Sequence, residues 1–197
     1  FYFGELHAHT GASGDGGSSD VGTCDGECGP ALEVAANAAE YGLDFLTYTD
    51  HANGNQSTTS ALFGEVQEAI RDAHDPDGGL VTLQAGELFF SLSGQPLGHK
   101  NIYFFADDEA LGDLTMEDMQ FDGVGEHVGD CAEIWSWMAQ MEETWGPVLL
   151  VPHHPGLPTG MGTDWSCHQG DEAAVYAPAV EIYSGHGDSS SVGTSFD

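Results

Sequence analysis

The sequence predicts an α/β protein in which strands and helices alternate along a single domain of 197 residues. Short apolar runs rich in branched and aromatic residues, typical of strands, are separated by segments whose apolar residues recur at helical spacing. No internal repeat or interdomain linker divides the chain, and its length fits one domain. Alternating strands and helices favour a parallel sheet or barrel, in which functional groups gather at the carboxyl ends of the strands.

The first third of the chain predicts a strand, a long loop and a helix. The apolar run 1–6 predicts a strand that leads into His7 and His9. A loop over 11–29, rich in Gly, Ser and Asp, follows it. A helix is expected next, with Pro30 at its first position and Gly42 as its stop. The apolar face of this helix is expected at Leu32, Ala35, Ala36 and Ala39.

The remaining elements continue the alternation. Residues 106–129 are acidic and irregular, so we expect them to form an excursion on the surface. A helix over 131–145 carries an apolar stripe expected in the core, formed by Ile134, Met138, Met141 and Trp145. The other expected elements are a strand over 44–49, a helix over 61–74, a turn over 75–79, and strands over 80–88, 101–105, 148–151 and 179–183.

The charge balance is strongly acidic. There are 33 acidic residues against only Arg71 and Lys100, so the formal net charge is −31. This charge should repel nucleic acid and anionic membranes, and it suits a saline environment in which screening weakens self-repulsion. No apolar stretch approaches the roughly 20 residues needed to span a bilayer, so no membrane insertion is expected. The start at Phe1 fits removal of a secretion signal, or a chosen boundary, and a secreted, periplasmic or extracellular location is expected.

The cysteine count is even, which fits two disulfides in an exported protein. Cys24 with Cys28 is the simplest pair to expect. Their spacing, Cys-Asp-Gly-Glu-Cys, also fits the beginning of a zinc knuckle, but the sequence has no second clustered pair. The four cysteines are Cys24, Cys28, Cys131 and Cys167.

Polar residues able to bind metal lie at or near the ends of all six expected strands. Residues two apart in a strand point to the same face, so both His7 and His9 can reach one ion. A carboxylate among imidazoles is suited to bridging two divalent ions. In chain order, these residues are His7, His9, Asp50, His51, Glu87, His99, His153, His154, Glu181 and His186.

Five motifs containing these residues follow one another along nearly the whole chain: Gly-Glu-Leu-His-Ala-His-Thr, Tyr-Thr-Asp-His, Ala-Gly-Glu-Leu, Gly-His-Lys-Asn and Pro-His-His-Pro. Their order is similar to that of the PHP (polymerase and histidinol phosphatase) superfamily. The late Val-Glu-Ile-Tyr-Ser-Gly-His-Gly most resembles a PHP-like branch known mainly as a domain of unknown function. The resemblance implies a distorted (β/α)7 barrel, with a cluster of two or three zinc, manganese or iron ions at its C-terminal mouth.

The same resemblance implies how the ligands are shared. One ion would be held by His7, His9 and Glu87. A second would be held by Glu87, His99 and a histidine of Pro-His-His-Pro; His154 is preferred because it precedes Pro-Gly as in the family, and His153 stays open. A third would be held by Asp15 and His51.

The sequence departs from the family at its closing motif. The family has an Asp-x-His on a seventh strand, and no such motif occurs here; His186-Gly-Asp188 has the reverse order. We therefore expect residues 1–197 to form a single PHP-like domain that is truncated at its C-terminal end and lacks its last strand. The alternatives are that the metal cluster is incomplete, or that self-association or a second chain completes the barrel.

The function expected from these motifs is a metal-dependent phosphoesterase that uses a metal-bound hydroxide on a small phosphorylated substrate. Asp50 is expected to take part in catalysis. Lys100 directly follows an expected ligand and could bind a phosphate oxygen, although it equally fits a plain surface lysine. The alternative is a secreted acidic structural or binding protein that has a PHP-like barrel and no turnover. Acidic residues of the loop 11–29 could also bind calcium, in addition to the role of Asp15 as a ligand of the third ion.

Overall fold

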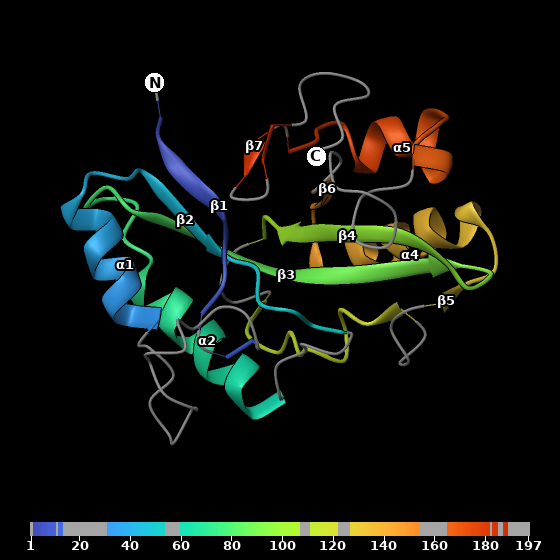
Figure 1. The fold of residues 1–197 in the computed structure, drawn as a ribbon. Helices are drawn as coiled ribbons and strands as arrows, with labels where there is room; N and C mark the ends of the chain where they lie inside the picture. The colour runs from blue at the N-terminus through green and yellow to red at the C-terminus, as the bar shows by residue number, and fades with distance from the viewer. Residues whose placement is uncertain are drawn as a thin grey trace.

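The computed structural model describes residues 2–10, 12–13, 31–53, 60–106, 111–121, 127–153, 165–181, 183–184 and 187–188. The fold is α/β, as predicted (Figure 1). The strands are β1 (Gly4–Ala8), β2 (Phe45–Tyr48), β3 (Val81–Leu92), β4 (Gln95–Phe104), β5 (His127–Val128), β6 (Val148–Pro152), β7 (Tyr183–Ser184) and β8 (Gly187–Asp188). The helices are α1 (Ala31–Glu40), α2 (Ser60–Ala73), α4 (Cys131–Trp145) and α5 (Asp171–Tyr176), with a 3-10 turn η2 (Trp165–Cys167).

Most strands belong to one mixed sheet. Its order is β1-β2-β3-β4-β6, with β5 pairing alongside β3, while β7 and β8 form a separate hairpin. Strands β1, β2 and β3 are parallel, and β4 is antiparallel to both β3 and β6. Within the described residues this sheet is open, so the closed (β/α)7 barrel expected from the sequence motifs is not seen in this part of the chain.

The parallel half of the sheet packs against α1 and α2, which lie side by side (Figure 1). Helix α1 ends where expected: Gly42 has a φ of 78°, and its N–H donates to the carbonyl of Ala39. The predicted apolar face of α1 was wrong in one respect, because Ala38 is buried whereas Ala39 is exposed. Helix α2 confirms its prediction, with Val66, Ala69 and Ile70 buried against the sheet.

The expectation of parallel strands fails at β3 and β4. These strands form a hairpin through a two-residue turn at Ser93 and Gly94, whose φ angles are 50° and 79°. Positive φ at both residues gives the turn a backbone twist that matches the twist of the flanking strands. The hairpin pairs Glu87 with Asn101 and Phe89 with His99. Side chains alternate between the two faces of a strand, so these four share one face, and their neighbours Leu88, Phe90 and Lys100 lie on the other.

The other face of the hairpin carries the larger core. It packs with α4, whose Ile134, Met138 and Met141 are buried as predicted. The prediction of a surface excursion over 106–129 was wrong for its described part. The apolar side chains of that part, which interrupt its acidic residues, fill the same core: Leu111, Leu114, Met116, Met119, Phe121 and Val128.

The last expected strand, 179–183, is shorter than predicted. Only Tyr183 and Ser184 are strand, pairing with β8, and Glu181 lies just before them outside any regular element. The backbone N–H of Glu181 donates to the carbonyl of Pro152 at 3.1 Å, which anchors this segment to the end of β6. None of the helices in the described residues has the length and apolar character needed to cross a membrane.

One disulfide lies in the described residues, between Cys131 at the start of α4 and Cys167 in η2. The predicted pair Cys24–Cys28 lies outside the described residues, as does most of the loop 11–29. The observed disulfide fits an oxidising compartment.

The disulfide should contribute strongly to stability, because its cysteines are 36 residues apart and the bridge restricts the unfolded chain. Replacing Cys131 and Cys167 together with alanine should lower the free energy of unfolding by about 4 kcal/mol on the chain-entropy estimate. Urea denaturation of both proteins in the same buffer and salt measures this difference. A loss below about 1 kcal/mol would show that the unfolded chain gains little freedom without the bridge.

Candidate metal centre

Two histidines at the end of β1 point to the same side of the sheet, as their spacing predicts. His7 lies within the strand and His9 directly follows it, and their Nε2 atoms are 3.1 Å apart. Both side chains are largely shielded from solvent, with 15% of each exposed. Two ring nitrogens therefore converge at the carboxyl end of β1.

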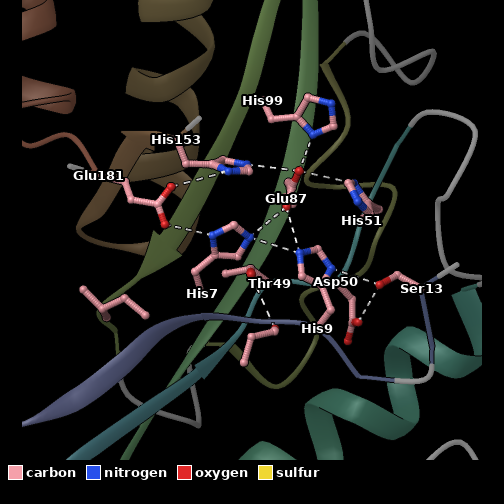
Figure 2. Close-up of polar contacts among 12 residues, drawn as sticks. His7, His9, Ser13, Thr49, Asp50, His51, Glu87, His99, His153 and Glu181 are labelled. Carbon is pink, nitrogen blue, oxygen red and sulfur yellow. Dashed lines mark hydrogen bonds and ion pairs between the residues drawn. The ribbon is translucent and has the colours of Figure 1, made fainter. Parts of the chain in front are cut away.

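The Glu87 carboxylate lies at the centre of the site, in the middle of β3 (Figure 2). Its Oε2 atom is 3.3 Å from His7 Nε2 and 3.0 Å from His9 Nε2. Metal–ligand bonds of about 2.0–2.1 Å place neighbouring ligand atoms about 3.3 Å apart around a tetrahedral ion and about 2.9 Å apart around an octahedral one. The three atoms are therefore spaced as the ligands of a single small divalent ion.

The second oxygen of Glu87 faces a different set of histidines. Its Oε1 atom is 3.0 Å from His153 Nε2 and 3.5 Å from His51 Nδ1, and it also contacts His99 Nδ1. His153 directly follows β6, and His99 stands diagonally across the β3–β4 hairpin from Glu87. One buried carboxylate thus has imidazoles on both of its oxygens, as a bridging ligand between two ions would.

His51 is positioned by pairing between its own segment and β3. The N–H of Ala52 donates to the carbonyl of Glu87, and the N–H of Glu87 donates to the carbonyl of Asp50. The Asn53 side chain extends this ladder, since its amide both donates to the carbonyl of Phe89 at 3.0 Å and accepts from the N–H of Phe89 at 2.7 Å. These bonds fix His51 relative to Glu87 through the backbone.

The far side of His9 is held by a hydrogen-bonded chain. Its Nδ1 is 3.1 Å from the Ser13 hydroxyl, which donates to Asp50 at 2.9 Å. A carboxylate can only accept, so the Ser13 proton points to Asp50, and the Ser13 oxygen accepts from His9 Nδ1–H. Thr10 donates to Asp50 through both its backbone N–H and its hydroxyl. His9 is therefore left with a lone pair on Nε2, directed toward Glu87.

The Glu181 carboxylate holds the outer ring nitrogen of His7 in the same way. It lies 3.2 Å from His7 Nδ1 and 3.8 Å from His153 Nδ1, on the side away from Glu87 (Figure 2). A carboxylate that accepts from the distal nitrogen fixes the imidazole tautomer whose other nitrogen can bind a metal. In the neutral form of His7, Glu181 thus directs the Nε2 lone pair toward Glu87.

Burial and close contacts between these side chains shift their pKa values. Burial alone would lower the pKa of His7, but hydrogen bonds to Glu181 and Glu87 outweigh it and raise that pKa to about 9. Burial lowers the pKa of His153 to about 4 despite its contact with Glu87. Burial would raise the pKa of Glu87, but hydrogen bonds from His153, His7 and its other histidine neighbours hold it well below its usual range. Glu87 is therefore ionised at neutral pH.

The donor set fits divalent metal. Neutral His7 and His9 would direct lone pairs at an ionised carboxylate oxygen, and three acceptors at 3.0–3.3 Å repel one another unless a cation or a proton lies between them. Imidazole and carboxylate ligands suit zinc, manganese and iron. In the described residues, three groups have ligand atoms within 4.8 Å of one another: His7, His9 and Glu87; His51, Glu87 and His99; and His7, His153 and Glu181.

Six of the predicted metal ligands come together in this centre: His7, His9, His51, Glu87, His99 and His153. Two others, Asp15 and the preferred His154, lie outside the described residues. His51 was expected beside Asp15, and in the described residues it groups with Glu87 and His99. His99 was expected at the start of a strand, and it lies within β4 instead.

The two residues predicted to act in catalysis lie elsewhere. Asp50 accepts from Thr10 and Ser13 behind His9, so it acts on the centre through another side chain. Lys100 is fully buried on the opposite face of the hairpin, where its Nζ donates to the carbonyl of Leu97 at 2.7 Å and lies over the Phe90 ring. This placement does not suit a phosphate-binding lysine.

Glu181 was noted at a strand end in the sequence but was not assigned to the site. Replacing it with glutamine should lower metal affinity roughly 10- to 100-fold, because His7 loses the charged acceptor that fixes its tautomer. Competition between the protein and a chromophoric chelator for Zn²⁺ measures this affinity. Glu172→Gln removes the same charge from the exposed first turn of α5 and serves as the control. Equal affinities in the two variants would contradict the assigned role.

No protein-family model matches the chain, and no curated protein matches it at a significant level. Among solved structures, the chain is similar to one from Bifidobacterium adolescentis described as a "putative metal-dependent phosphoesterase", with 12% identity and a TM-score of 0.45. The likeness covers 92% of this chain and 77% of that one. At this identity and score, it does not establish a shared function.

Proposed function

We propose that this protein is a metal-dependent hydrolase, and specifically a phosphoesterase of the PHP type that acts at a di- or trinuclear centre. The observation that carries the proposal is the convergence of His7 Nε2, His9 Nε2 and Glu87 Oε2 at 3.0–3.3 Å. The order of the sequence motifs supports the same assignment. When bound, divalent ions supply a Lewis acid and a nucleophile from water near neutral pH.

In such a centre, some side chains would bind the ions and others would orient the ligands. Glu87 would bridge two ions, with His7 and His9 on one oxygen and His51, His99 and His153 around the other. Glu181 and the Ser13–Asp50 pair hold the outer nitrogens of His7 and His9, which keeps these two rings oriented. An oriented ligand set does not have to reorganise during reaction, which lowers the cost of reaching the transition state.

The direct test is hydrolysis of bis(p-nitrophenyl) phosphate by the metal-loaded protein. We expect activity that depends on Zn²⁺, Mn²⁺ or Fe²⁺ and that falls by more than about 100-fold in His9→Ala, because one ion loses a ligand. His74→Gln is the matched control: this histidine bonds to Thr82, five residues before Glu87 on β3. Equal activity in His9→Ala and His74→Gln would contradict the proposal.

The same experiment separates the proposal from its alternative. A protein that binds divalent metal at this centre but hydrolyses no phosphoester would be a binding protein without turnover. A protein that binds no divalent metal would lack the hydrolytic centre altogether. Metal analysis of the purified protein therefore accompanies the activity assay.

A further inference from the structure

The supply of positive charge near the centre is unusually small, and this restricts the substrate. The whole chain has only two basic residues other than histidine, Arg71 and Lys100. Enzymes that bind phosphate groups commonly use arginine or lysine to match the charge of the phosphoryl oxygens. The placement of these two residues therefore decides whether the chain can offer such a group.

Neither residue is available to a substrate at the centre. The Lys100 ammonium is fully buried, bonded to the carbonyl of Leu97 on the face of the hairpin opposite His99. Arg71 lies in the last turn of α2, next to Ile70, whose carbonyl accepts from Thr82 at 2.7 Å. Thr82 is five residues before Glu87 on β3, a distance of about 16 Å along the strand.

The position where a cation could stand beside the centre is apolar. Phe89 lies on the same face of the hairpin as Glu87 and His99, and its ring centroid is 5.4 Å from that of His99. The Phe89 side chain is partly exposed. Both its backbone N–H and its carbonyl are hydrogen-bonded to the Asn53 side chain, so the backbone that carries this apolar ring is held beside the histidines.

The carboxylates of the site would neutralise much of the positive charge of any bound metal ions. Glu87, Glu181 and Asp50 lie within or directly behind the ligand set. Two divalent ions would carry only one positive charge more than these three carboxylates. The chain as a whole has a formal net charge of −31, which opposes the approach of any anion.

From this charge inventory, and given the proposed hydrolytic function, we infer that the substrate carries no more than one negative charge at its reacting group and places an apolar substituent against Phe89. A phosphodiester has this chemistry, whereas a phosphomonoester is a dianion at pH 8 because its second pKa is near 6. The substrate class is thus an aryl or alkyl diester, or a neutral ester of similar shape.

The test is binding of methyl phenyl phosphate and phenyl phosphate to the Zn²⁺-loaded protein, by calorimetry at pH 8. These ligands differ in charge and carry the same ring. Methyl phenyl phosphate should bind roughly tenfold more tightly, since one charge in a partly screened site corresponds to about that factor. Tighter binding of phenyl phosphate would overturn the inference while leaving the proposed hydrolase intact. Absence of Zn²⁺ binding would overturn both.

A variant pair tests the role of Phe89. Phe89→Lys should place a cation beside the centre and shift the preference toward phenyl phosphate by roughly tenfold. Phe105→Lys adds the same charge at an exposed position, six residues beyond His99 and about 20 Å away along the strand, and should leave the preference unchanged. Equal shifts in the two variants would assign the preference to net charge and overturn the role of Phe89.

Discussion

Replacing Glu87 with glutamine should abolish tight binding of divalent metal at both positions of the centre. Its two carboxylate oxygens face separate sets of histidines, and glutamine offers one neutral oxygen in place of a bridging charge. We expect a loss of affinity larger than the roughly 10- to 100-fold caused by removing an outer-shell partner. Metal content after dialysis, together with chelator competition, measures the effect.

The matched control for this variant is Glu143→Gln, which makes the same change at an exposed position on α4. It should retain the metal content of the wild-type protein. If Glu87→Gln still holds two ions, Glu87 cannot be the bridge. Circular dichroism of each variant checks that the fold is kept, because Glu87 is buried.

Metal affinity should fall steeply as the pH drops from 8.5 to 6.5. In the metal-free protein, the pKa of His7 is about 9, so His7 carries a proton that a metal ion must displace. Low pH therefore favours the metal-free state, by about tenfold per pH unit, or about 100-fold over this range. The pKa of His153, lowered to about 4, keeps that ring neutral throughout.

Chelator competition at several pH values measures this slope, and calorimetry in buffers of different ionisation enthalpy measures the released proton directly. Glu181→Gln removes one of the hydrogen bonds that raise the pKa of His7, so its slope should begin at a lower pH. An affinity that is independent of pH between 8.5 and 7.5 would show that His7 is neutral before metal binds.

The sequence predicted most of the candidate site because polar ligands follow or interrupt its apolar runs with clear spacing. His7 and His9 are two apart at the end of a strand, and Glu87 interrupts an apolar run. The arrangement around them was harder to predict. Parallel and antiparallel neighbours share the same alternation of side chains, so only the turn at Ser93-Gly94 distinguishes a hairpin from two separate strands.

Lys100 and Glu181 show what could and what could not be predicted from the sequence. Lys100 follows His99, and alternation along a strand already implies that neighbours face opposite ways, so its burial away from the centre could have been predicted. Glu181 could not, because it lies outside regular structure and is positioned by one backbone bond to Pro152 at the end of β6. Tertiary contacts of this kind leave no periodic pattern in the sequence.

The most direct test of the account is an anomalous difference map from crystals of the Zn²⁺-loaded protein, with data on both sides of the zinc absorption edge. The account predicts a zinc peak within bonding distance, about 2.0–2.2 Å, of His7 Nε2, His9 Nε2 and Glu87 Oε2, and a second peak on the Oε1 side of Glu87. A map with no peak between His7, His9 and Glu87 would contradict the account, because protons alone would then hold these side chains together.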